Sequence, residues 1–154
     1  MSDVDATDRT TPIGLYNMGL AYLEAARAVS VSDNRIAFQD PLDFLCAHGL
    51  ELIFKAEMLR TLSMNEVRNQ FGHNLSVLKN KLGVDFTNKF PMTNELQNVI
   101  NYLEIGHSGP DWTNRYIKTG VKIALSPEQI LAALACFTTS SRTWLSNHFV
   151  KATV

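Results

Sequence analysis

Four segments of the chain place apolar residues at the three- and four-residue spacing of a helix. The first begins at Pro12, a residue common in the first turn of helices, and its apolar pattern continues to about Val29. The second begins with Asp40 and Pro41, which predict a helix start, and runs to about Leu62. Apolar residues surround this second segment almost completely, so we expect it to be the central helix.

Two further long helices are predicted from their start signals. Asn94 with Gln97 matches a capping box and predicts a helix over about residues 95–105. The sequence SPEQ at positions 126–129 combines a serine cap, a proline in the first turn and an acidic residue. It predicts one last helix that continues to about Phe149.

Shorter helices are predicted between the second and third long segments. Ser63 with Glu66 forms a capping box for a short helix that ends near Gly72. Asn74 is a suitable cap for another short helix that ends at Gly83. The sequence VDFTNKFPMT at positions 84–93 is predicted to be a loop.

These elements predict an all-α fold. Residues 106–125 are expected to form one long irregular loop, and residues 1–11, which have no apolar period, a disordered tail. Residues 12–150 are then a single domain. Its predicted architecture is an up-and-down bundle of four principal helices with short accessory helices.

Composition narrows the classes of partner. A chain of 154 residues with 45% hydrophobic residues is long enough to bury one core, and its net charge of −1 does not attract nucleic acid or membranes overall. No apolar run is long enough to span a membrane, and the first ten residues lack the apolar core of a signal peptide, so we expect a cytoplasmic protein. Cys46 and Cys136 have no CxxC or CxxH neighbours, which argues against zinc, redox and disulfide motifs.

Charged residues interrupt the most apolar segment of the chain, LCAHGLELIFKAEMLR at positions 45–60. His48, Glu51 and Lys55 are spaced at i, i+3 and i+7, which places them along one face of a helix. A glutamate four residues before a lysine is the favourable order for an ion pair. A structural ion pair is the preferred interpretation, and a ligand-binding site is the alternative.

The order of three short motifs resembles the HEPN superfamily over about residues 12–150. The hydrophobic helix with an E-L-x-x-K core corresponds to Glu51 and Lys55, the G-H-[DN]-L turn to residues 72–75, and a downstream Arg-Tyr pair to Arg115 and Tyr116. The resemblance implies a helical bundle, often dimeric, that is associated with RNA cleavage, nucleotide binding or toxin and defence systems. It makes Glu51, Lys55, Arg115 and Tyr116 candidate binding residues. It also predicts that His73 lies close to the Glu51 and Lys55 face.

Catalytic members of this superfamily carry an arginine, then about four to six residues, and then a histidine. The chain has two such strings, RNQFGH from Arg68 to His73 and RTWLSNH from Arg142 to His148. The implied chemistry needs no metal, because the histidine is a general acid or base toward a ribose 2′-hydroxyl and the arginine stabilises phosphate charge. The first string, with Arg68 and His73, is the candidate catalytic pair.

Other candidate sites have less support. His107 lies in the sequence GHSGPDW, where glycine and proline predict an exposed turn histidine. The sequence contains no Walker motif, dinucleotide fingerprint, His/carboxylate metal motif or nucleophile elbow. We therefore expect neither a cofactor nor a metal site.

Three functions are consistent with the sequence. The first is a non-catalytic HEPN-like binding or interaction domain that associates with a nucleotide or RNA. The second is a metal-independent endoribonuclease of the toxin or defence type that uses Arg68 and His73. The third is a structural protein that dimerises or binds a protein partner. A homodimer is predicted because Phe137, Trp144 and Phe149 on the last helix suggest an apolar face that needs covering.

Overall fold

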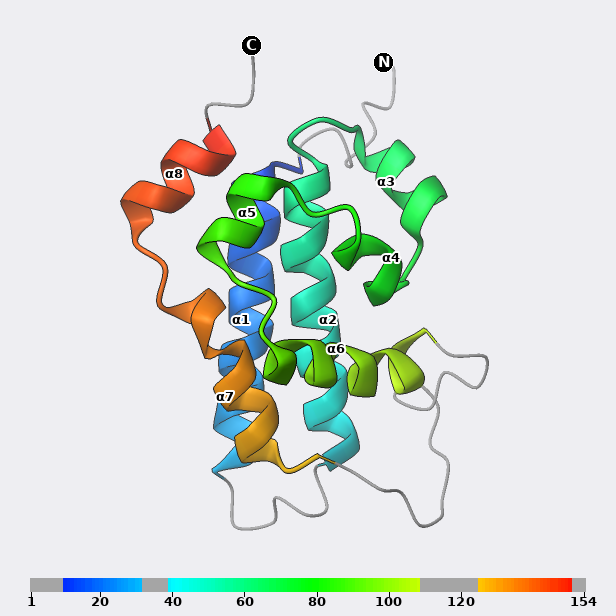
Figure 1. Cartoon of the computed structure of the whole chain (residues 1–154), viewed down its shortest axis with the longest axis vertical. Coiled ribbons are helices and arrows are strands. Elements are labelled where there is room, and N and C mark those ends of the chain that lie inside the picture. Colours follow the sequence, from blue (N-terminus) through cyan, green and yellow to red (C-terminus); the bar gives the residue numbers. More distant parts are fainter. Residues whose placement is uncertain (1–9, 32–38, 109–124, 151–154) are drawn as a thin grey trace, which may run out of the picture.

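The protein is all-α, as predicted. A computed structural model describes residues 10–31, 39–108 and 125–150, and every regular element in these ranges is a helix. The helices are α1 (Pro12–Ser30), α2 (Gln39–Met58), α3 (Met64–Phe71), α4 (Leu75–Lys79), α5 (Val84–Lys89), α6 (Asn94–His107), α7 (Pro127–Thr138) and α8 (Arg142–Val150) (Figure 1). Most of the predicted tail and long loop lies outside the described residues. None of the described helices has the length and the apolar character needed to cross a membrane.

α2 is the central helix, as its apolar pattern predicts. Every residue from Gly49 to Met58 is buried, and α1, α4, α6 and α7 all pack against α2. α1 and α2 lie side by side in opposite directions, and α6 crosses in front of α2 (Figure 1). Charged residues in this stretch of α2 are therefore held inside the bundle.

Two glycines allow α1 and α2 to approach closely. A Cβ atom on Gly19 would lie 2.7 Å from the carbonyl oxygen of Gly49 and 2.7 Å from Cγ1 of Ile53. A Cβ atom on Gly49 would lie 2.9 Å from the carbonyl oxygen of Gly19. Contacts this short with backbone atoms are relieved only if the two helices move apart, so the glycines set the helix separation.

Replacing Gly19 with Ala is expected to lower the free energy of unfolding by about 1–3 kcal/mol, as overpacking of a core does. The loss appears even though alanine favours helix over glycine by about 1 kcal/mol. Urea denaturation measures it, with exposed Asn17→Ala on the same helix as a control that stays within about 0.5 kcal/mol. A more stable Gly19→Ala protein would show that the helices are not in close contact.

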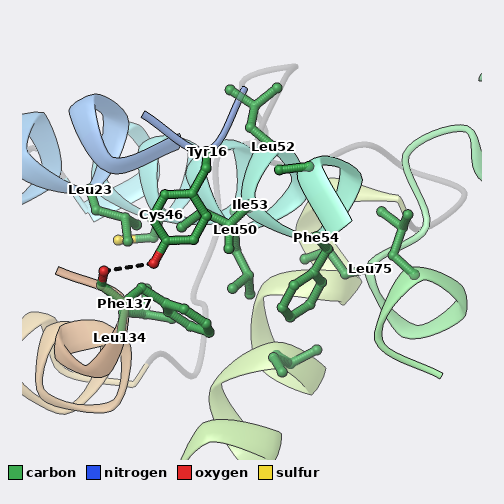
Figure 2. Close-up of a cluster of buried hydrophobic side chains, with 14 of the residues drawn as sticks. Tyr16, Leu23, Cys46, Leu50, Leu52, Ile53, Phe54, Leu75, Leu134 and Phe137 are labelled. Atoms are coloured by element: carbon green, nitrogen blue, oxygen red, sulfur yellow. Dashed lines mark hydrogen bonds between the residues drawn. The ribbon is translucent and has the colours of Figure 1, made fainter. Parts of the chain in front are cut away.

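All of the described helices contribute buried apolar residues to the core, part of which Figure 2 shows. Phe54, Phe86, Phe90 and Phe137 are all at most 1% exposed and contact one another through their rings. The hydroxyl of Tyr16 donates a hydrogen bond to the backbone carbonyl of Phe137 at 2.8 Å, as Figure 2 shows. This bond satisfies a polar group buried among apolar side chains and joins α1 to the end of α7.

Most predicted helix starts are confirmed. Ser63 with Glu66 and Ser126 with Gln129 form complete capping boxes. The side chain of Asn74 accepts a hydrogen bond from the backbone N–H of Val77 at 2.9 Å. These caps join residues only three positions apart, so sequence alone identifies them.

The predicted start of α6 and end of α2 are wrong by a few residues. Thr93, not Asn94, caps α6 by accepting a hydrogen bond from the N–H of Leu96 at 3.2 Å. α2 ends at Met58 rather than Leu62. Just beyond Met58, the backbone N–H groups of Arg60 and Thr61 donate to carbonyls three residues back, which is the tighter 3₁₀ pattern.

The predicted last helix is two helices. α7 ends at Thr138 and α8 begins at Arg142. The hydroxyls of Thr138 and Thr139 donate to carbonyls three residues back, at 2.9 and 3.2 Å, and Ser141 accepts from the N–H of Trp144 at 3.2 Å. Hydroxyl side chains therefore compete with the helical backbone bonds here and end one helix before the next begins.

The segment at positions 84–93 is not entirely a loop, because residues 84–89 form α5. Phe86 on α5 is fully buried in the aromatic core. A helix of 6 residues is too short to display a repeating apolar pattern, so periodicity could not reveal it.

Candidate functional site

Glu51 lies at the centre of a buried polar cluster. Its Oε1 accepts a hydrogen bond from Nζ of Lys55 at 2.6 Å and is 2.9 Å from Nδ1 of His73. Its Oε2 forms a short hydrogen bond with Nε2 of His107 and lies 3.9 Å from Nδ1 of His48. We call these five residues the Glu51 cluster.

Three parts of the chain supply the cluster. His48, Glu51 and Lys55 follow one face of α2, and His107 lies in the last turn of α6. His73 follows Gly72, whose φ of 52° is a conformation that favours glycine and ends α3. The prediction that His73 lies close to the Glu51 and Lys55 face is confirmed.

The interior of the cluster is charged. Burial raises the pKa of the Glu51 carboxyl, but the hydrogen bond to His107 and the charge and hydrogen bond of Lys55 have a larger combined effect. The pKa falls to about 2, so Glu51 is ionised at neutral pH. Glu51 and Lys55 are 1% and 5% exposed, which makes them a buried ion pair rather than a surface bridge.

The cluster reaches solvent through two histidines. The side chain of His73 is 40% exposed and that of His48 is 25% exposed, whereas His107 is fully buried. Beside His48, Phe44 stacks at 5.7 Å between ring centroids and Tyr22 contacts it edge-on at 4.6 Å. Aromatic and imidazole side chains therefore surround the solvent-accessible part of the cluster.

The two candidate catalytic residues, Arg68 and His73, lie in different surroundings. Arg68 is exposed on α3, and no hydrogen bond joins it to His73 in the described part of the chain. Arg115 and Tyr116, the remaining candidate binding residues, lie outside the described residues. The cluster thus contains His73, Glu51 and Lys55 of the predicted site.

The arginine and the histidine of the second string lie in different surroundings. Arg142 is exposed at the start of α8, and His148 is buried with its Nε2 2.6 Å from Oε2 of Glu57. The ring of His148 stacks on Trp144 at 4.5 Å, and Arg60 donates to the other oxygen of Glu57 at 2.9 Å. His148 therefore joins α8 to α2 as part of the core.

The prediction for His107 is wrong. α6 continues through Gly106 to His107, where the imidazole is 0% exposed and bonded to Glu51. A buried charge-assisted hydrogen bond outweighs the local turn preference of the glycine-rich sequence. One sequence signal pointed this way, because His107 follows Leu103 and Ile100 at i+4 and i+7 on the buried stripe of the helix.

A His/carboxylate group also appears that the sequence did not indicate. One donor atom each from His48, Glu51 and His107 lies within 4.8 Å of the others. Glu51 and His107 are 56 positions apart, so a short spacing motif does not reveal this group.

Family models, curated proteins and solved structures give no match to this chain. Two of the three motifs that resemble the HEPN superfamily lie in the part of the chain that the structure describes. The E-L-x-x-K core lies on α2, and the G-H-N-L turn joins α3 to α4. The two motifs meet in the Glu51 cluster through the contact between Glu51 and His73.

Proposed function

We propose that the protein is a non-catalytic HEPN-like binding domain that associates with a nucleotide or RNA. The observation that carries this proposal is the Glu51 cluster, in which a buried ion pair holds two partly exposed histidines. The buried carboxylate orients the ring of His73 through a contact of 2.9 Å. A partly exposed imidazole of this kind can bind the phosphate of a nucleotide.

The surroundings of His48 support the same proposal. Tyr22 and Phe44 are partly exposed and contact the His48 ring. Bases of single-stranded nucleic acids stack on aromatic side chains, at about 1–3 kcal/mol per base. Because the net charge of the chain is −1, such binding depends on this local site rather than on the overall charge.

His73→Gln is expected to weaken binding of a fluorescent single-stranded RNA or an adenine nucleotide by about tenfold, the equivalent of one charge-assisted hydrogen bond. Fluorescence anisotropy at low salt measures the affinity. Arg142→Gln is the control, since it removes an exposed charge from α8 without touching the cluster. Equal affinities for wild type and His73→Gln, or no binding by wild type, would count against the proposal.

One observation favours the endoribonuclease alternative. The 2.9 Å contact between Glu51 and His73 resembles the carboxylate that orients a catalytic histidine. Cleavage also requires an arginine near the phosphate, and Arg68 shares no hydrogen bond with His73 among the described residues. We therefore expect no cleavage of mixed RNA in EDTA. Cleavage that disappears in both His73→Ala and Arg68→Ala would replace the binding proposal with this one.

The aromatic residues on which the predicted homodimer rests are mostly buried within the chain itself. Phe137 and Phe149, from which an apolar face was inferred, are 0% and 3% exposed within the chain's own core. Trp144 is partly buried and contacts His148 and Phe90. These residues therefore do not support a dimer face, and the third function, a structural protein that dimerises, loses that argument.

A further inference from the structure

We propose that His48, Glu51 and His107 bind a divalent transition-metal ion, with Zn²⁺ as the first candidate. One donor atom from each residue lies within 4.8 Å of the others. Both imidazoles face the same carboxylate oxygen, Oε2 of Glu51. This inference does not depend on the proposed association with a nucleotide or RNA.

The donor set suits zinc more than magnesium or calcium. Two imidazole nitrogens and one carboxylate oxygen are ligands that zinc and cobalt accept, whereas Mg²⁺ and Ca²⁺ prefer oxygen alone. Three protein ligands leave one position of a tetrahedral ion open. The Glu51–Lys55 pair is neutral as a whole, so we expect hydroxide or another anion at that position to offset part of the charge of the ion.

The cluster is built to hold the ligands in place. Lys55 and His73 occupy Oε1 of Glu51, which keeps Oε2 directed at the two imidazoles. His48 and Glu51 share one face of α2 at i and i+3. Contacts like those of Lys55 and His73, from residues that do not bind the ion themselves, orient the ligands of metal sites.

His107 is held against the carboxylate. Its imidazole is 0% exposed, and its Nε2 forms a short hydrogen bond with Oε2 of Glu51. Nε2 is therefore the nitrogen that would bind the ion, and the ion replaces the proton that His107 shares with Glu51.

Only a small movement is needed for binding. Zinc takes nitrogen and oxygen ligands at about 2.0–2.2 Å, which places the ligand atoms roughly 3.3 Å from one another. Nδ1 of His48 is 3.9 Å from Oε2 of Glu51 and must move closer, whereas Nε2 of His107, which is in a short hydrogen bond with Oε2, must move away to admit the ion. His48 is the most exposed of the three residues, and its side chain also gives the ion a route from solvent.

Titration with Co²⁺ alone tests the site on untagged, EDTA-treated full-length protein. We expect one equivalent of Co²⁺ to produce the strong visible absorption of a tetrahedral ion, and one equivalent of Zn²⁺ to abolish it. Zn²⁺ should also raise the Tm of wild type in a concentration-dependent way, because the ion binds only the folded protein. Wild type without either signal would overturn the proposal.

Variants of the histidines locate the site, since the chain has only four. His48→Gln is expected to lower the affinity for Co²⁺ at least about tenfold, as loss of a ligand does. His148→Gln is the matched control, because its ring contacts Glu57 rather than Glu51, and it should bind like wild type. Unchanged affinity in a folded His48→Gln protein would overturn the assignment; if that variant does not fold, the tetrahedral spectrum and the Tm shift of wild type decide.

Discussion

Replacing Glu51 with Ala is expected to lower the free energy of unfolding by about 3–5 kcal/mol, as the loss of one partner of a buried ion pair does. The variant leaves Lys55 charged at 5% exposure and removes the hydrogen-bond partner of buried His107. Urea denaturation measures the effect. Glu24→Ala is the matched control, because Glu24 pairs with Arg27 on the surface of α1 and is 51% exposed. The control should lose no more than about 1 kcal/mol.

A double variant separates the buried charge from the lost volume. Glu51→Leu combined with Lys55→Met removes both charges and keeps similar side-chain volumes. We expect it to recover part of the stability that Glu51→Ala loses, because no uncompensated charge stays in the core. If the double variant is as unstable as the single one, lost packing rather than charge explains the effect.

The contribution of Glu51 also depends on pH. Its pKa in the folded protein, about 2, is below the ordinary value of 4.5, because Lys55 and His107 outweigh the effect of burial, and His48 and His73 also face the carboxylate. A lowered pKa of this size corresponds to about 3 kcal/mol. The stabilisation is complete above about pH 5 and is lost as the pH falls toward 2. In EDTA, the stability difference between wild type and Glu51→Gln should shrink over this range; a constant difference would contradict the lowered pKa.

Replacing Phe86 with Ala is expected to cost about 3–5 kcal/mol, the usual loss for a fully buried phenylalanine. Its ring is 0% exposed and lies 4.8 Å from that of Phe90 and 6.3 Å from that of Phe137. The substitution leaves a cavity between α5 and the rest of the core. Thermal or urea unfolding measures the loss.

A neighbouring residue on the same short helix provides the control for Phe86. Val84→Ala changes a side chain that is 69% exposed, so its effect should stay within about 0.5 kcal/mol. A small loss for both variants would mean that α5 does not contribute to the core. That result would favour the loop that the sequence alone predicted for this segment.

Local signals in the sequence were sufficient for much of the helical framework. The capping boxes at Ser63 and Ser126 are interactions across three residues, and the apolar residues on nearly all sides of α2 predicted its central position. The face shared by Glu51 and Lys55 follows from helix geometry alone. The break before α8 was also encoded locally, in the run of hydroxyl residues from Thr138 to Ser141, but the apolar period across it concealed the signal.

The sequence by itself determined the fold class, most helix starts and the Glu51–Lys55 pair, because each depends on residues within about one helical turn. Tertiary structure alone decided which histidines face which carboxylates. Glu51 contacts His73 and His107 across 22 and 56 positions, and Glu57 contacts His148 across 91. Such partners are selected by the need to satisfy buried charges once the helices pack. This need placed His107 in the core against its local turn preference and placed His148 against Glu57.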